Sequence, residues 1–154
     1  MKKIRFIPAI ALALATATTS VQAHDDAYLD TQQAPHGGQL RMAGAYHPEL
    51  VVDKSTPQAA DKTVVVYVTD HAGQKVSTDG ATGNATILAA KGKASVALVP
   101  DGDNRLKGTG RYASTADMKA IISFTAKGQP PETARFTPLL KAMPGDAGHH
   151  NHKP

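Results

Sequence analysis

Histidines that lie close to carboxylates are the residues of this sequence most suited to chemistry. His47 and Glu49 stand two positions apart in a run typical of a β-strand, so their side chains leave the same face. An imidazole beside a carboxylate is a workable pair of ligands for Cu(II), Zn(II) or Ni(II). His36 is a candidate third ligand. Alternatively, His36 caps a loop, and His47 and Glu49 are ordinary polar residues of an edge strand.

The position of His36 depends on the hairpin that follows it. If this hairpin is centred on Gly44, Gln39 lies opposite Glu49 and Arg41 lies opposite His47. A fully extended chain would then leave His36 roughly 10 Å beyond Glu49 at the rise of a strand. The metal hypothesis therefore requires the pair Gly37-Gly38 to bend the chain back.

Two further groups of histidines lie near the ends of the chain. His24 would become the first residue if a signal peptidase cut after Ala23, and its amine and imidazole would then chelate Cu(II); the alternative is an adventitious site on a mobile end. The C-terminal tract collects ions by composition, without a rigid site, through His149, His150 and His152. Because the chain has no cysteine, thiolate ligands are excluded.

The first 23 residues have the pattern of a cleavable signal peptide. Lys2, Lys3 and Arg5 form a positive start, and an apolar stretch over 6–15 and the sequence Val21-Gln22-Ala23 follow. That apolar stretch is well short of the roughly 20 residues of a spanning helix, so we expect no membrane span after cleavage. We therefore expect an exported, periplasmic protein.

Cleavage also changes the charge balance. Removing three of the 17 basic residues leaves 14 against 13 acidic ones, which gives no basic patch for nucleic acid or an anionic membrane. No serine stands in a nucleophile elbow, and adjacent strand residues such as Asp70 and His71 point to opposite faces. We therefore expect no enzyme activity.

Short apolar and β-branched runs separated by turn residues predict an all-β fold. The clearest strand is 63–69, and further strands are expected at 39–43, 46–53, 74–77, 85–90, 94–100, 119–126 and 133–138. Seven to eight short strands predict an antiparallel β-sandwich, immunoglobulin-like, with a partly open barrel as the alternative. We expect a flexible leader over 24–35, the β-sandwich domain over 36–138 and a disordered His-rich tail over 139–154.

Three segments around the first hairpin resemble a group of small periplasmic proteins and domains attached to adaptor subunits of heavy-metal efflux systems. The segments are Pro35-His36-Gly37-Gly38-Gln39-Leu40, then Tyr46-His47-Pro48-Glu49-Leu50-Val51-Val52, and then 66–76, which ends in an Asp-x-x-Gly turn. The resemblance covers about residues 34–77. It implies periplasmic handling of copper or another divalent ion, with His36, His47 and Glu49 at the matching positions and an efflux adaptor as a partner.

Three functions remain open from the sequence. The first is a non-catalytic periplasmic protein that buffers or delivers copper or a related ion in heavy-metal resistance or efflux. The second is a structural or interaction module of the cell envelope, in which the histidines are incidental. The third is a copper oxidase-type enzyme that uses His24.

Overall fold

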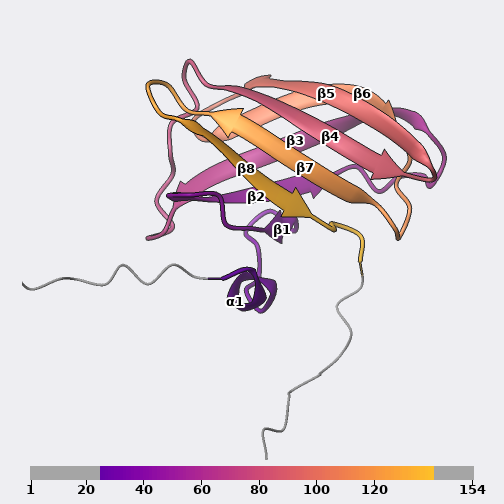
Figure 1. The fold of residues 1–154 in the computed structure, drawn as a ribbon, viewed down its shortest axis with the longest axis horizontal. Coiled ribbons are helices and arrows are strands. Elements are labelled where there is room, and N and C mark those ends of the chain that lie inside the picture. Colours follow the sequence, from indigo (N-terminus) through magenta and orange to yellow (C-terminus); the bar gives the residue numbers. More distant parts are fainter. Residues whose placement is uncertain (1–24, 141–154) are drawn as a thin grey trace, which may run out of the picture.

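Side chains that alternate between the core and the outer surface build the strands. In the longest strand, Val64, Val66 and Val68 are buried, and Val65 and Tyr67 between them face outward. This period of two is the geometry of a pleated strand with one buried face. The structure is a computed structural model and describes residues 25–140 (Figure 1).

One short helix and eight strands follow in chain order. They are α1 (Asp26–Asp30), β1 (Gln39–Leu40), β2 (Tyr46–Val52), β3 (Ala60–Asp70), β4 (Thr82–Ala89), β5 (Gly92–Pro100), β6 (Arg105–Tyr112), β7 (Lys119–Thr125) and β8 (Pro131–Phe136). No helix within these residues is long and apolar enough to cross a membrane.

The strands form one antiparallel sheet that curls into a nearly closed barrel. Their spatial order is β1-β2-β3-β6-β5-β4-β7-β8. Because β4, β5 and β6 follow one another directly while β3 and β7 flank them, the chain makes two overlapping Greek keys. In Figure 1, β4, β7 and β8 lie in front of β2 and β3. The prediction of an all-β antiparallel fold is confirmed.

Apolar side chains from both layers meet in one core. Leu50 of β2, Ile87 of β4 and Phe136 of β8 are each at most 1% exposed and belong to the same cluster. Val, Leu, Ile and Ala supply most of this core, because the chain has no tryptophan and only three phenylalanines.

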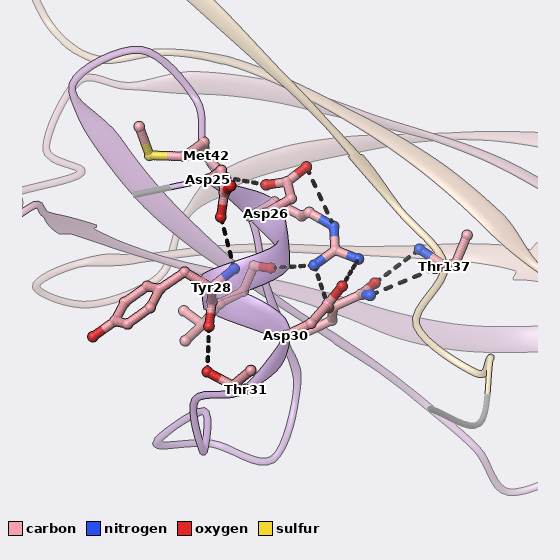
Figure 2. A network of polar contacts seen from close by, with 10 residues as sticks. Asp25, Asp26, Tyr28, Asp30, Thr31, Met42 and Thr137 are labelled. Carbon is pink, nitrogen blue, oxygen red and sulfur yellow. Dashed lines mark hydrogen bonds and ion pairs between the residues drawn. The ribbon is translucent and has the colours of Figure 1, made fainter. Parts of the chain in front are cut away.

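The first and last strands are joined by a side chain. The Oε1 atom of Gln39 in β1 accepts the backbone N–H of Thr137, just after β8, at 2.8 Å, and its Nε2 lies 3.5 Å from the Thr137 hydroxyl (Figure 2). A single glutamine therefore bridges the two edges of the sheet.

The segment before β1 differs from the expected flexible leader, because it holds α1. Asp25 caps the helix by accepting the Tyr28 N–H at 2.8 Å, and Leu29 is buried (Figure 2). A helix of five residues is too short to persist alone in water. Contacts with the barrel must therefore hold it.

Arg41 supplies those contacts. Its side chain is only 9% exposed, and its Nη1 lies 2.6 Å from Oδ1 of Asp30 and its Nε 3.7 Å from Oδ2 of Asp26. Asp26 also accepts the backbone N–H of Met42 at 2.9 Å (Figure 2). No pattern in the sequence indicated this helix because the segment has no apolar period; the residue that contacts it lies eleven positions beyond Asp30.

The register expected for the first hairpin is wrong by one residue. Gln39 lies opposite Leu50, and Leu40 lies opposite Glu49. Ala43 bridges Tyr46, so the turn consists of Gly44 and Ala45, with Gly44 at φ +56°. This is the glycine-first pattern of a type II′ turn, which places the centre half a residue beyond Gly44. The expected strand at 74–77 is reduced to an isolated bridge between Thr69 and Lys75.

Candidate metal centre

The loop before β1 folds back onto the carboxylate of Glu49. Oε1 of Glu49 accepts the backbone N–H groups of His36 and Gly38, each at 2.9 Å, and Oε2 lies 2.8 Å from Nδ1 of His36. Glu49 is only 2% exposed. Both carboxylate oxygens therefore already contact the loop. The first role of Glu49 is to hold this loop in place rather than to bind an ion.

The glycine pair makes this return possible. Gly37 has a φ of +70°, and its N–H closes a turn onto the carbonyl of Ala34 at 3.1 Å. A side chain at Gly38 would collide with the carbonyl oxygen of Leu50 and crowd Cγ of Glu49 at 2.9 Å. The bend that the metal hypothesis required is therefore present, and each glycine has its own steric reason.

The hydrogen bond to Glu49 determines the proton position on His36. A carboxylate only accepts, so Nδ1 of His36 is the donor in this contact, and in the neutral form of an imidazole Nε2 then carries the lone pair. Metal-binding histidines almost always donate their other ring N–H to a carboxylate, carbonyl or water in this way. The His36 side chain is 42% exposed, so solvent and ions have access to it.

Tyr67 of β3 supports the His36 ring. The two rings stack with their centroids 3.5 Å apart and their planes 4° from parallel. Tyr67 lies directly opposite Glu49 in the β2–β3 ladder and opposite Arg105 in the β3–β6 ladder. A hydrogen bond with Tyr67 raises the pKa of Arg105, and Asp101 adds to the effect. The imidazole is therefore held along one edge by Glu49 and across one face by Tyr67.

His47 lies two residues before Glu49 in β2, on the same outer face. Pro48 and Leu50 point into the core, so His47 and Glu49 both point outward, as predicted. His47 is 8% exposed, and its ring stacks on that of His71 with centroids 4.8 Å apart.

The turn after β3 positions His71 next to His47. Asp70 accepts the backbone N–H groups of Ala72 and Gln74 at 2.9 and 2.8 Å, which tightens the turn. Nε2 of His71 lies 3.2 Å from the carbonyl oxygen of Gly44. Because a carbonyl only accepts, Nε2 is the donor in this contact, and in the neutral form of an imidazole Nδ1 then carries the lone pair.

The structure brings together only part of the predicted ligand set. His36 meets Glu49, whereas His47 meets His71, and no group of three or more histidine, aspartate or glutamate side chains within residues 25–140 could hold a metal ion as it stands. The candidates His24, His149, His150 and His152 lie outside the described residues, as does the expected signal peptide.

Sequence reasoning did not assign His71 and Tyr67 to the site. The β2–β3 register carries the missing information, because it pairs Glu49 with Tyr67 and His47 with Thr69, two residues before His71. If one residue pair between β2 and β3 had been assumed, counting along β3 from that pair would have placed both residues near the site.

The sequence matches no protein-family model, no curated protein and no solved structure.

Proposed function

We propose that this chain is a periplasmic protein that binds copper or another divalent ion on the outer face of β2 and β3, without catalysing a reaction. The observation that carries the proposal is the hydrogen bond between Glu49 and His36. This hydrogen bond leaves Nε2 of the partly exposed His36 ring as the atom that would bind the ion, in an arrangement that metal-binding histidines favour. Glu49 then acts by orienting the ligand rather than by binding the ion.

Two further imidazoles lie nearby on the same face. His47 lies two residues from Glu49 along β2, so the two positions are about 7 Å apart at the rise of a strand. His71 adds a second imidazole there, because its ring stacks on that of His47. Nitrogen donors suit Cu(II), Zn(II) and Ni(II), and an incomplete set suits a protein that releases its ion to a stronger site.

The cellular role follows from the sequence resemblance. We propose that the protein buffers or delivers the ion in heavy-metal resistance or efflux, with a periplasmic efflux adaptor as the receiving partner. We also propose an immunoglobulin-like sandwich as the finer description of the fold; the two Greek keys and the two packed layers support it.

Titration of the purified full chain with Cu(II) tests the proposal. The terminal histidines are first removed by His24→Gln, His149→Asn, His150→Asn and His152→Asn, so that only the barrel contributes. This background protein should bind Cu(II) with submillimolar affinity by calorimetry. His36→Gln should weaken binding by at least about tenfold, and Glu49→Gln by about 10 to 100-fold, the range for loss of an orienting carboxylate.

Lys75→Gln is the matched control, because Lys75 is an exposed residue near the same turn and carries no imidazole. Thermal unfolding of each variant separates loss of binding from loss of folding. If the background protein binds no Cu(II), Zn(II) or Ni(II), or binds equally well without His36, the His-Gly-Gly loop serves only to close the edge of the sheet. The chain is then better explained as an envelope interaction module.

A further inference from the structure

An open cavity of about 260 Å³ lies at one end of the barrel. It opens between the end of β6, at Arg111–Ala113, and the hairpin that joins β4 to β5. The loop that holds Pro57 covers a third side. This end is remote from His36, because Arg111 lies six residues along β6 from Arg105, about 20 Å at strand rise.

The cavity lies at the end of the barrel where no ladder joins β5 and β6. They pair only at Val99–Lys107 and Pro100–Leu106, whereas β5 pairs with β4 along most of its length. Gly108 and Gly110 let β5 pass close over β6, since a side chain at either position would collide with Ala97 or Val96. Beyond Lys107 no ladder joins the two strands, and the cavity lies at the far end of this unpaired stretch.

The walls of this cavity are apolar. Ile87, Ala89 and Tyr112 are buried residues of its wall, and Ala94 projects inward from β5. None of the residues that the structure places around the cavity is acidic. An apolar body is therefore the part of a ligand that fits inside.

Positive charge surrounds the mouth. Lys93 of β5 and Arg111 of β6 line opposite sides and are exposed, and the ion pairs found within residues 25–140 do not include either of them. Lys62 lies behind the wall, 2% exposed, with Nζ 5.4 Å from the centroid of the Tyr112 ring and 2.9 Å from Oγ of Ser114. Asp61 lies opposite Arg111 in the β3–β6 ladder, so three cations stand against one carboxylate at this end, and the net positive charge favours an anion.

We propose that the cavity binds a small amphiphilic carboxylate, with its apolar body between β5 and β6 and its carboxylate on Arg111 and Lys93. An apolar cavity of roughly 150 Å³ holds benzene, so this one suits a ligand of about ten non-hydrogen atoms. A guanidinium matches a carboxylate through two parallel hydrogen bonds, which makes Arg111 the main anchor. This site is separate from the proposed metal site and does not depend on it.

Octanoate has the required size and is the probe. Calorimetry on the full chain should show saturable binding of octanoate, and 1-octanol, which has the same body without the charge, should bind at least about tenfold more weakly. Arg111→Gln should weaken the binding of octanoate by a similar factor. In methyl NMR spectra, octanoate should give contacts to Ile87 and Ala94.

A filling substitution tests the position of the ligand. Ala94→Leu places a larger side chain in the cavity and should abolish octanoate binding, whereas Ala97→Leu, exposed on the same strand, should not. Cu(II) binding should be unchanged in all three variants. Absence of octanoate binding at millimolar concentration, equal binding of octanol, or full binding by both Arg111→Gln and Ala94→Leu would overturn the proposal. If Ala94→Leu does not fold, Arg111→Gln and the NMR contacts decide.

Discussion

Glu49 holds His36 through both oxygens of its carboxylate: Oε1 accepts the backbone N–H at 2.9 Å, and Oε2 accepts the ring Nδ1–H at 2.8 Å. The main chain and the side chain of one histidine are thus fixed by one buried group. This relationship makes the loop before β1 a part of the barrel and gives the imidazole a single orientation.

Glu49→Gln should lower the free energy of unfolding by about 2 kcal/mol. An amide keeps the shape of the carboxylate but has no charge, and hydrogen bonds to a charged acceptor are the stronger ones. Its NH2 group also forces the His36 ring to change tautomer, so that Nδ1 accepts. Urea denaturation measures the change. The other glutamate of the chain, as Glu132→Gln, is the control, and an equal effect of both variants would contradict a special role of Glu49.

Gly38→Ala should destabilise the protein more than Gly37→Ala does. Alanine at Gly37 has open space around it and pays only for its positive φ, about 1 kcal/mol. Alanine at Gly38 meets the carbonyl of Leu50 and must shift β2 or the loop, at a cost of about 3 kcal/mol. Thermal unfolding ranks the two variants, and the reverse order would show that the loop is not seated on β2.

Arg41→Met should release α1 from the barrel. The substitution removes the ion pairs to Asp30 and Asp26, and a five-residue helix does not persist without such contacts. Because both aspartates are about half exposed, the loss of stability should be only about 1 kcal/mol. Hydrogen exchange should show faster exchange at the amides of Leu29 and Gln32, while those of β3 stay protected.

Alkaline pH should weaken the fold through Tyr112. Burial is the main cause that raises the pKa of Tyr112 from 10.0 to about 12. Between these values the unfolded chain releases the tyrosine proton and the folded chain keeps it, so stability falls as pH rises. Urea midpoints across this window should decrease, and Tyr112→Phe, although less stable at neutral pH, should show a shallower decrease. Identical slopes would contradict the assignment to Tyr112.

Cu(II) should quench the tyrosine fluorescence of the protein through Tyr67. The chain has four tyrosines and no tryptophan, and the Tyr67 ring stacks on the imidazole proposed to bind the ion. Tyr67→Phe should therefore remove most of the quenching, and His36→Gln should remove it as well. Zn(II), which is not paramagnetic, is the control. Undiminished quenching in Tyr67→Phe would place the ion elsewhere.

The sequence predicted what depends on local pattern. The β-branched run at 63–69 became the centre of β3, and the strands expected at 85–90 and 94–100 became β4 and β5, which a two-residue turn at Ala90-Lys91 joins. Gly37 and Gly38 allowed the return of His36 that the metal hypothesis required.

The errors concern long-range partners. The register of the first hairpin depends on which residue of the Gly44-Ala45 turn comes first, and a shift of one residue reassigns every pair. Similarly, α1 depends on Arg41, and the contact of His71 with His47 depends on a turn at the far end of β3. No local period in the sequence encodes these relationships.

The link between Gln39 and Thr137 also bears on self-association. An exposed edge strand is a template on which another copy can add a strand, and long open edges promote aggregation. Here β1 has only two residues, β8 begins with Pro131, which has no N–H to donate, and a glutamine side chain spans the two strands. To extend the sheet, an incoming strand would have to displace the Gln39 side chain. The gap between β1 and β8, where the barrel does not close, is therefore protected against polymerisation.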